Sequence, residues 1–491
     1  MAESNERVRD TAPRADDRRW KTAVGDGSLL LVKRLIVIGG GISGLAAAHA
    51  AASELGTDLE VLVLEKAGEV GGKARTESIG PWRVETGPAG YLDGEPALDR
   101  LVESAGLHDE VVVANDDAAN RFIVRRGEMR AVSPHPLRLA RSGILGVSGL
   151  LRILGEPFVR RGHGDESVWD FAARRLGPQV ADRLVAPMVL GVFAGDAKSL
   201  SLAAAFPKLA ALESEHGSLL KGMVKSRRAG RSDGAAAPSG TLTSFREGIQ
   251  TLPLRLAESR LFEVRRNTAV REIRQRTGRW LVEPESGPAI EADAVALACE
   301  SWAMAKVLRN SSAKLSRLLE EIPCPPVAIV ALGFGSSALN TVPRGFGALI
   351  PRGEGYRILG VLFDSHVFRG RSPQGTLLVR AFLGGAVDPE AVAGDDQSIE
   401  ALAVADVSRL LRLDEKPDFR HVIRWDKAIP QYEIGHLERV RAVESELTHL
   451  PGLFLAGNAL YGIAFSKAAA AGEAAGTAAA RYLASPKPSE Q

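Results

Sequence analysis

The chain has 491 residues, with 62 Lys and Arg against 60 Asp and Glu, so its formal net charge is +2. This length predicts two or three domains with sizeable cores, and the balanced charge gives no reason to expect nucleic acid as a partner. Residues 1–33 are charged and polar without an apolar signal core, so we expect a flexible tail there. No run approaches the roughly 18 uninterrupted apolar residues of a membrane-spanning helix. Cys299 and Cys324 have no C-x-x-C spacing, so we expect no metal site and a reducing compartment such as the cytoplasm.

The most informative motif lies near the N-terminus, where four apolar residues at 35–38 run into a glycine turn and an alanine-rich helix. Gly39, Gly41 and Gly44 have the G-x-G-x-x-G spacing, which allows a tight turn, a close approach of backbone to a pyrophosphate, and close packing of helix on strand. A second apolar strand at 59–64 ends in Glu65, about 20 residues after Gly44, where an acid receives a ribose hydroxyl. Strand, turn, helix, strand and acid in this order predict a dinucleotide site, because an ordinary βαβ unit does not require these glycines together with the acid.

Two loops that suit a nucleotide cofactor follow this unit. The paired glycines Gly71 and Gly72 precede Lys73 and Arg75, a pattern that fits a loop closing over phosphates and equally a plain surface turn. Residues 82–91 predict a short strand that ends in a loop able to approach a ring face.

The next part of the chain, residues 97–230, is predicted to be mostly helical. Residues 137–161 mix Leu, Ile, Val and Phe with five arginines. Such a segment is typical of a helix on an anionic membrane surface, and equally of a helix packed on its own domain. Residues 229–240 are rich in Gly, Ser and Ala, and we expect a mobile loop.

The remaining chain alternates strands and helices. Strands of the nucleotide-binding part are predicted near residues 264, 270–273, 280–282, 294–298 and 453–458, and an alanine-rich helix is predicted from about Ser466. Further β-type runs at 327–334, 358–363 and 376–383 predict a separate mixed sheet. We therefore predict a nucleotide-binding domain in three pieces (34–96, 240–325 and 441–485), a helical insertion (97–230) and a substrate domain (326–440).

Several further stretches occur in the order that one family shows. They are residues 191–196 (GVFAGD) with 200–202 and 206–207 behind them, 216–222 (HGSLLKG), 345–347 (GFG), 359–365 (LGVLFDS) and 429–436 (IPQYEIGH). With the glycine fingerprint, they resemble the oxygen-dependent, FAD-containing porphyrinogen oxidases of haem synthesis, within the flavin amine-oxidase superfamily. The resemblance covers residues 33–483, and the stretch 429–436 is the most specific part of it.

The resemblance implies an α/β fold with a discontinuous Rossmann-like FAD-binding domain, a mixed-sheet substrate domain and a helical insertion. Glu65 and Lys66 would lie at the adenosine ribose, and the backbone of Val270 at the adenine edge. The loop 87–90 would lie beneath the flavin, with residues 463–465 against its ring. The implied FAD contacts are Gly39, Gly40, Gly41, Ile42, Ser43, Gly44, Glu65, Lys66, Gly72, Lys73, Gly87, Pro88, Ala89, Gly90, Val270, Gly457, Ile463, Ala464 and Phe465.

The implied substrate is a tetrapyrrole. Arg121 matches an arginine that pairs a propionate, for which bidentate guanidinium geometry is apt. Gly191, Phe346 and Leu349 would line an apolar slot, although plain core packing also accounts for Phe346 and Leu349.

The implied activity is the six-electron oxidation of protoporphyrinogen IX to protoporphyrin IX with dioxygen as acceptor. Coproporphyrinogen III stays open as the substrate, as do an amine oxidase or desaturase and a flavin-binding protein whose activity has lapsed. We assign no catalytic side chain, because the cofactor carries the difficult step. His216 and His436 are predicted to be packed or capping histidines.

Two departures from the family pattern affect these expectations. Ala89 stands where many members have arginine or asparagine, and Ser466-Lys467-Ala468 stands where Asn-Asp-Cys is usual. Ser466 could still cap the C-terminal helix, whereas Lys467 is expected to change the field at the pyrimidine end of the flavin. Peripheral membrane contact and a homodimer are left open.

Overall fold

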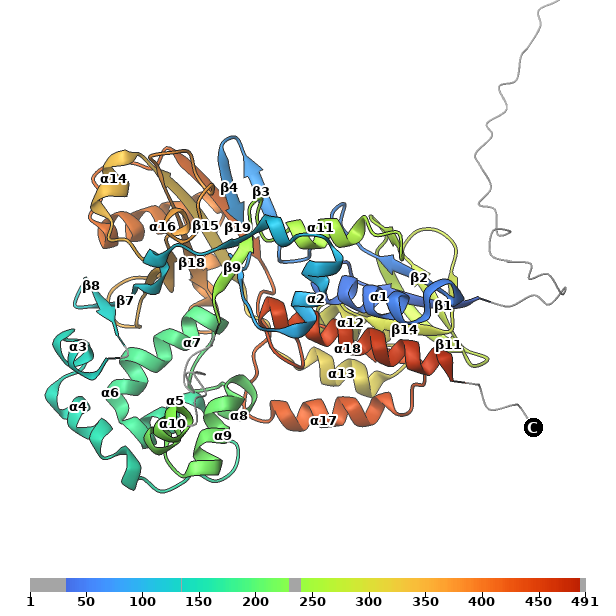
Figure 1. Cartoon of the computed structure of the whole chain (residues 1–491), viewed down its shortest axis with the longest axis horizontal. Helices are drawn as coiled ribbons and strands as arrows, with labels where there is room; N and C mark the ends of the chain where they lie inside the picture. Colours follow the sequence, from blue (N-terminus) through green and yellow to red (C-terminus); the bar gives the residue numbers. More distant parts are fainter. Residues whose placement is uncertain (1–31, 134, 229–239, 486–491) are drawn as a thin grey trace, which may run out of the picture.

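The computed structural model describes residues 32–133, 135–228 and 240–485. The predicted tail over 1–33 lies outside the described residues up to residue 31, and it is wrong at Lys33, which begins β1 because it pairs with Leu59 of the next strand. The predicted loop over 229–240 lies outside them up to residue 239. Figure 1 shows three parts: a nucleotide-binding half on the right, a second sheet at the upper left, and a group of helices at the lower left.

A parallel sheet organises the nucleotide-binding half. Its strands in spatial order are β10 (Glu263–Arg265), β2 (Leu59–Leu64), β1 (Lys33–Ile38), β14 (Ala294–Leu297) and β20 (Leu453–Leu455). They come from three separate stretches of the chain, which confirms the predicted discontinuous Rossmann-like fold. The register places Ile38 beside Leu64, so Gly39 and Glu65 leave the sheet at the same edge. The central strands β1, β2 and β14 are apolar over most of their length because both faces of the sheet are covered.

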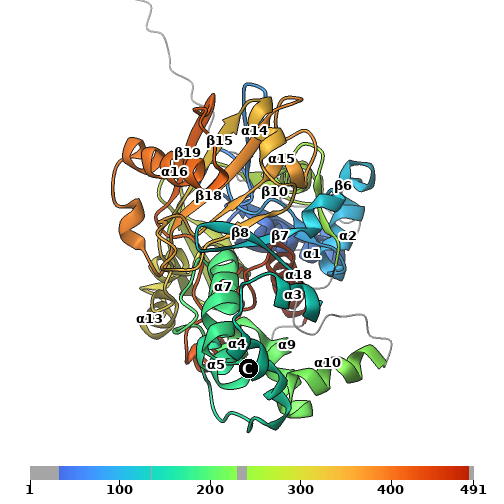
Figure 2. The ribbon, with the colours of Figure 1, turned by 90° about the vertical axis from the view of Figure 1, so that its left-hand side faces the viewer.

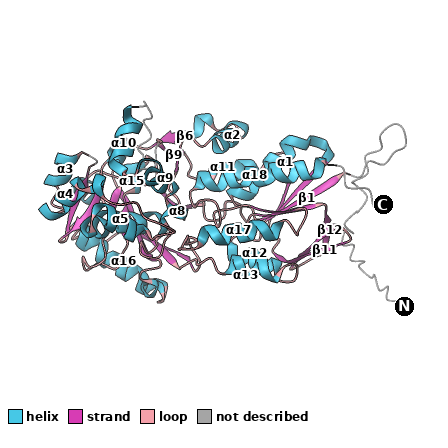
Figure 3. Ribbon diagram, turned by 90° about the horizontal axis from the view of Figure 1, so that it is seen from below, coloured by secondary structure: helices cyan, strands magenta, loops and turns pink. Residues whose placement is uncertain are grey.

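Figure 3 shows helices on the two sides of this sheet. One side carries α1 (Ile42–Leu55), α2 (Pro96–Ser104), α11 (Thr251–Ala257) and α18 (Phe465–Ala484). The other carries α12 (Ser301–Leu308), α13 (Ala313–Glu320), α17 (His436–Leu447) and a small antiparallel sheet of β11 (Val270–Arg276), β12 (Arg279–Pro284) and β13 (Ile290–Ala292). The predicted boundary at 440/441 falls inside α17, whose Val440 and Val443 pack into this core.

Helices α1 and α18 come from opposite ends of the chain and pack with their backbones in close contact. A Cβ at Gly472 would lie 2.1 Å from the carbonyl oxygen of Ser43, and one at Gly476 would lie 2.2 Å from that of Ala47. Only glycine fits at such an approach. The C-terminal helix thus lies directly on the helix of the glycine fingerprint.

A seven-stranded mixed sheet forms the second part, here called the sheet half. Its spatial order is β19 (Phe419–Trp425), β15 (Val327–Phe334), β18 (Leu377–Gly384), β17 (Gly360–Leu362), β16 (Gly347–Leu349), β7 (Arg121–Arg125) and β8 (Glu128–Val132). Helices α14 (Ser336–Thr341) and α16 (Asp396–Leu411) contribute to its core, and α15 (Asp364–Val367) follows β17. The strands predicted at 327–334, 358–363 and 376–383 are all present.

The helical prediction for residues 97–230 is wrong over residues 111–132. Strands β6 (Val111–Val113), β7 and β8 lie there, and short runs of Val, Ile and Phe account for them. Strand β7 pairs in parallel with β16, so the sheet half takes two strands from the predicted helical insertion.

Two small sheets lie between the halves. One is the hairpin of β3 (Thr76–Ile79) and β4 (Trp82–Glu85), and the other consists of β5 (Tyr91–Leu92), β9 (Leu242–Phe245) and β6. Trp82 of the hairpin stacks on Phe419 of β19, with ring centroids 5.0 Å apart.

The helical part, below the sheet half in Figure 2, begins after β8. It comprises α3 (Pro136–Arg141), α4 (Val147–Leu154), α5 (Val168–Leu176), α6 (Pro178–Val180), α7 (Ala186–Phe193), α8 (Leu202–Ala205), α9 (Pro207–His216) and α10 (Leu219–Arg228). The stretch 216–222 is structural, because Glu156 accepts hydrogen bonds from the backbone N–H of Leu219 (2.8 Å) and Leu220 (3.2 Å). A Cβ at Gly222 would lie 2.9 Å from the ring of His216, which confirms the predicted packing role of that histidine. Within the described ranges, no helix is long and apolar enough to cross a bilayer.

Candidate flavin and substrate site

The glycine turn has the geometry that its spacing predicted. Gly39 has a φ of +114°, and a Cβ at Gly44 would lie only 1.8 Å from the carbonyl oxygen of Gly39. Gly41 is the N-cap of α1 and makes no side-chain cap, and no described atom lies within 4 Å of the position of its missing Cβ. The first turn of a helix has N–H groups without intrahelical partners at the positive end of the dipole, so open space beside Gly41 suits a pyrophosphate.

Glu65 lies beside this turn and is almost completely buried. Its carboxylate accepts hydrogen bonds from the N–H of Gly40 (2.6 Å) and of Ala67 (2.8 Å). A carboxylate has about four acceptor positions, so ribose hydroxyls can still be received there. Thr268 donates its N–H to the carbonyl of Glu65 (2.8 Å), which brings the start of β11, and with it Val270, close to the same place.

The loop with the paired glycines lies on the glycine turn rather than apart from it. Gly71 donates its N–H to the carbonyl of Gly40 (2.9 Å), and a Cβ at Gly72 would contact the Cα of Gly41 at 3.5 Å. The ammonium of Lys73 binds Glu300 (2.7 Å) and the carbonyl of Ala428 (2.5 Å). Lys66, in contrast, is exposed and lies over the ring of Trp302 at 5.3 Å.

The loop 87–90 runs between the two halves without room for larger residues. A Cβ at Gly87 would lie 2.3 Å from the carbonyl oxygen of Lys73, and one at Gly90 would lie 2.2 Å from that of Thr243. Pro88 and Ala89 are half-buried between them. Ala89 packs in an apolar cluster that also contains Phe346 of the sheet half.

The C-terminal residues named for the cofactor lie around the end of β20 and the start of α18. Gly457 follows β20 with a φ of +115°. Ile463 packs in a cluster with Tyr432, Ala464 is the N-cap of α18, and Phe465 stacks on Tyr91 with centroids 6.0 Å apart.

One expectation about this segment is corrected. Ser466 does not cap α18, because the helix begins one residue earlier, at Phe465, and its N-cap, Ala464, makes no side-chain cap. The ammonium of Lys467 pairs with Glu95 at 2.6 Å on the exposed side of the helix, and its effect on the flavin stays a prediction. The hydroxyl of Ser43, moreover, donates to the carbonyl of Ala468 (2.6 Å) and so ties α1 to α18.

The four predicted substrate residues form two separate pairs, Arg121 with Phe346 and Gly191 with Leu349, and their role stays a prediction. The guanidinium of Arg121 lies 5.4 Å from the ring centroid of Phe346, and β7 pairs with β16 so that Arg121 stands opposite Gly347. A Cβ at Gly191 of α7 would lie 2.5 Å from a methyl group of Leu349. Phe346 and Leu349 are half-buried, Gly191 is exposed, and no described carboxylate pairs with Arg121.

The sequence analysis missed a group of buried charges between the halves. Arg380 of β18 is completely buried and donates its Nε–H to Asp364 at 2.9 Å. Glu85, at the end of β4, accepts a hydrogen bond from Thr76 (2.7 Å) and lies 3.4 Å from Arg371. Burial raises the pKa of the Glu85 carboxyl to about 7, although Arg371 opposes the shift. The available signal was a single arginine inside the apolar strand Leu377–Gly384.

The family-like stretch 429–436 supports the C-terminal cofactor segment. Tyr432 accepts the N–H of Gly462 (2.7 Å), and its hydroxyl donates to the carbonyl of Asn458. His436 stacks on Tyr432 with ring centroids 4.1 Å apart, which confirms that it is a packed histidine. Burial lowers the pKa of His436 to about 4.

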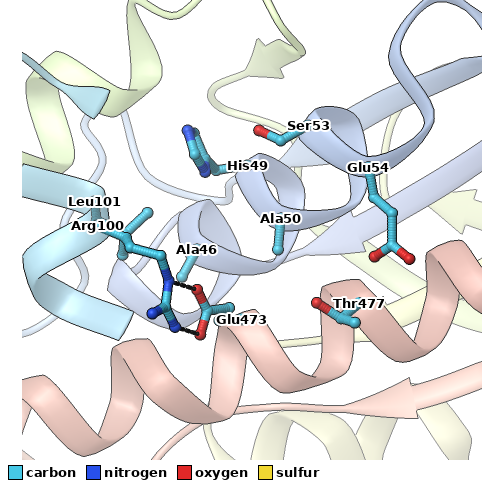
Figure 4. Close-up of a pocket in the computed structure, with 9 residues that line it drawn as sticks. All are labelled: Ala46, His49, Ala50, Ser53, Glu54, Arg100, Leu101, Glu473 and Thr477. Carbon is cyan, nitrogen blue, oxygen red and sulfur yellow. Dashed lines mark hydrogen bonds and ion pairs between the residues drawn. The ribbon is translucent and has the colours of Figure 1, made fainter. Parts of the chain in front are cut away.

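A cavity of about 290 Å³ lies elsewhere, between α1, α2 and α18 on the outside of the nucleotide-binding half (Figure 4). Arg100 and Glu473 form a two-bond ion pair at its rim, at 2.8 and 2.6 Å. None of the residues that line this cavity belongs to the site described above.

The fold and the site together define a flavin-dependent oxidoreductase with FAD as cofactor. The family model of "Flavin containing amine oxidoreductase" matches residues 42–480, and the chain belongs to this family.

Relatives and solved structures agree with this family. The chain is 29% identical over 466 residues to a coproporphyrinogen III oxidase of Bacillus subtilis (strain 168), covering 92% of this chain and 98% of the relative. It is 32% identical over 459 residues to a chloroplastic protoporphyrinogen oxidase of Oryza sativa subsp. japonica, covering 88% and 85%. A crystal structure provisionally named a protoporphyrinogen oxidase, from Exiguobacterium sp. 255-15, superposes with a TM-score of 0.79 at 24% identity, covering 91% of this chain and 99% of that chain.

Proposed function

We propose that this protein oxidises a porphyrinogen to the corresponding porphyrin, with FAD as cofactor and dioxygen as electron acceptor. Protoporphyrinogen IX is the first candidate substrate, and the relative from rice carries that activity in its name. The proposal includes the FAD contacts and the substrate residues that the sequence analysis named.

The observation that carries the proposal is the position of Arg121. Its guanidinium has no carboxylate partner among the described residues, and it stands at the rim of an apolar wall that includes Phe346. A flat, apolar macrocycle with carboxylate side chains requires this combination of a cation and an apolar surface. Ala89, from the loop proposed to lie beneath the flavin, packs in the same cluster as Phe346, so wall and cofactor would be adjacent.

FAD, when bound, supplies hydride acceptance and reoxidation by dioxygen. The residues of this chain then have three tasks: α1 and Glu65 hold the cofactor, Arg121 orients the substrate through a propionate, and the apolar wall excludes water. No side chain is assigned as an acid or a base.

The test is anaerobic mixing of the FAD-loaded protein with protoporphyrinogen IX, followed by admission of air. We expect bleaching of the flavin absorbance, and then porphyrin fluorescence as the flavin colour returns. A flavin that stays oxidised at saturating porphyrinogen would contradict the proposal and favour a flavin-binding protein. Bleaching by an amine instead would indicate an amine oxidase.

Coproporphyrinogen III is the second candidate, because the alignment to the Bacillus subtilis relative covers 98% of that protein. The two porphyrinogens differ by two propionates in place of two vinyl groups, so one further cation would decide between them. Rates measured side by side with both substrates separate the candidates.

We further propose that the helical part contacts an anionic membrane surface. Val147, Leu151 and Leu154 lie on one face of α4 and are each more than 60% exposed, and Phe158 is 90% exposed. Exposed arginines flank this face: Arg138, Arg141, Arg160 and Arg161. An apolar face with a basic border suits the headgroup region of anionic lipid.

Flotation with vesicles tests this contact. We expect binding to vesicles containing phosphatidylglycerol, weaker binding to pure phosphatidylcholine, and loss of binding in Leu151→Glu. Leu261→Glu, at a comparably exposed position in the nucleotide-binding half, is the matched control. Equal behaviour of the two variants, or no flotation of the wild type, would contradict the contact.

A further inference from the structure

Three consecutive backbone carbonyls at the end of β4 are held by side chains from the sheet half. Arg380 donates from one Nη to the carbonyl of Glu85 (2.6 Å) and to that of Gly87 (2.9 Å). Trp425, at the end of β19, donates its Nε1–H to the carbonyl of Thr86, between them, at 2.8 Å. The two donors come from different strands: Arg380 lies 295 residues further along the chain than Glu85, and Trp425 lies 339 residues further along than Thr86.

We call these three carbonyls and the two side chains that bind them the clamp. Its arginine is buried, and a nearby carboxylate balances the charge. Arg380 has no exposed surface, and its Nε pairs with Asp364 at 2.9 Å. Burying a guanidinium costs free energy unless its charge is paired, and Asp364 supplies that pairing, whereas the second Nη of Arg380 has no hydrogen-bond partner among the described residues. This assigns a role to the family-like stretch 359–365, which brings Asp364 to the start of α15 beside β18.

The opposite side of the same segment is fixed by the nucleotide-binding half. Thr86 donates its N–H to the carbonyl of Arg75 (2.9 Å), and Gly87 lies so close to the carbonyl of Lys73 that a Cβ would be 2.3 Å from it. Residues 85–87 are thus held between the loop after Gly72 on one side and the sheet half on the other. They immediately precede the loop residues 88–90.

We propose that Arg380 and Trp425 are positioning residues for the flavin. They act through the backbone of 85–87, and so set where the loop 87–90 meets the ring relative to the wall that contains Phe346. This rests on the FAD site of the proposed function. Because the positions of both donors are fixed by β18 and β19, any displacement of the sheet half moves the loop beneath the ring, and the two halves are coupled at this point.

The experiment compares variants that keep the packing and remove the donors. Trp425→Phe removes the bond to Thr86 and keeps an aromatic ring near the ammonium of Lys73, which lies 5.9 Å from the centroid of the Trp425 ring. Arg380→Lys keeps the charge but presents a point charge on a flexible stem instead of a planar fork, so it does not hold two carbonyls and Asp364 together. Arg420→Met is the control: Arg420 is an exposed arginine of β19 that pairs with Glu400 and is absent from the clamp.

The readouts are the FAD dissociation constant, the visible spectrum of the bound flavin and its midpoint potential, each with circular dichroism as a check on the fold. We expect both clamp variants to stay folded, to bind FAD about tenfold more weakly, and to show a shifted flavin absorbance and potential. The control is expected to match the wild type in all three measurements.

Wild-type affinity, spectrum and potential in both Trp425→Phe and Arg380→Lys would overturn the inference. Loss of the fold in Arg380→Lys leaves Trp425→Phe to decide it in the same way. Failure of the proposed function has a different signature, because the wild type itself would then bind no FAD, or would bind FAD that no porphyrinogen bleaches.

Discussion

The glycine fingerprint and the clamp at residues 85–87 fix the backbone around the same proposed cofactor by opposite means. Around the fingerprint, backbone packs directly on backbone because no side chain intervenes. A Cβ at Gly44, Gly472 or Gly476 would collide with a carbonyl oxygen. At the clamp, contacts are made by long side chains, in which Arg380 and Trp425 reach across from another domain.

The difference shows how each region responds to change. A backbone packed on a backbone has no rotamer with which to adjust, so added volume must move a helix or a strand. The clamp lies beside the buried carboxyl of Glu85, whose pKa is raised by burial, so stability in this region depends on pH.

The largest effect is expected from breaking the fingerprint with Gly44→Ala. The new Cβ would lie 1.8 Å from the carbonyl oxygen of Gly39, so α1 must shift away from β1. We expect a loss of about 3 kcal/mol or more in the free energy of unfolding, together with loss of FAD. Denaturant unfolding and the flavin content of the purified protein measure both effects.

Gly68→Ala is the control for this substitution. A Cβ there would meet only the side-chain oxygen of Asn267, at an ordinary 3.5 Å. Its unfolding free energy should stay within about 1 kcal/mol of the wild type. If both variants lose the same unfolding free energy, steric crowding at Gly44 is not the cause of the loss.

The contribution of the clamp region to the free energy of unfolding is expected to depend on pH. Burial raises the pKa of the Glu85 carboxyl from 4.5 to about 7, so the folded state holds this proton more tightly than the unfolded chain does. The corresponding stability is fully present below pH 4.5 and is lost as the pH rises through 7, by up to about 3 kcal/mol.

Glu85→Gln removes this titration and is the variant to compare. The unfolding free energies of both proteins are measured from pH 4.5 to 8. Below pH 7 the wild type should lose stability with rising pH more steeply than the variant, and above pH 7 the two slopes should become equal. Parallel curves over the whole range would mean that Glu85 does not change its protonation in this window.

A smaller effect, confined to the cofactor, is expected from Glu65→Gln. The carboxylate that accepts the N–H groups of Gly40 and Ala67 would lose its charge, and with it strong acceptance of ribose hydroxyls. We expect FAD to bind about 30-fold more weakly, which corresponds to about 2 kcal/mol. Fluorescence titration with FAD measures this, with Glu60→Gln near the start of β2, the strand that precedes Glu65, as control. An unchanged affinity would remove Glu65 from the proposed ribose site.

The smallest predicted effect concerns the substrate. Arg121→Gln should raise KM for a porphyrinogen about tenfold with a smaller change in kcat, because the guanidinium pairs a propionate away from the reacting bond. Arg125→Gln is the control, since Arg125 is already engaged by Glu354 at 2.9 Å. A fall in kcat without a change in KM would place Arg121 in another role.

The sequence predicted the nucleotide-binding half well because its signals are local. Gly39, Gly41, Gly44 and Glu65 lie within one βαβ unit, and the apolar strands and the alanine-rich helix were found close to their observed bounds. The strands at 111–132 were missed because they are short and depend on distant partners: β7 pairs with β16, more than 200 residues further along, and β6 pairs with β9. Ser466 was misplaced for a related reason: the start of α18 is set by its packing on Tyr91 and α1 rather than by a capping side chain.

The amino-acid sequence by itself determined the parallel sheet, the glycine turn and the family, since period, spacing and motif order are properties of neighbouring residues. Only the tertiary structure decided which distant side chains and carbonyls meet: that Arg380 holds the carbonyls of Glu85 and Gly87, that Trp425 holds that of Thr86, and that Lys467 pairs with Glu95. Such pairs join residues hundreds of positions apart, and the free energy that selects them depends on burial and distance, which a linear pattern does not contain.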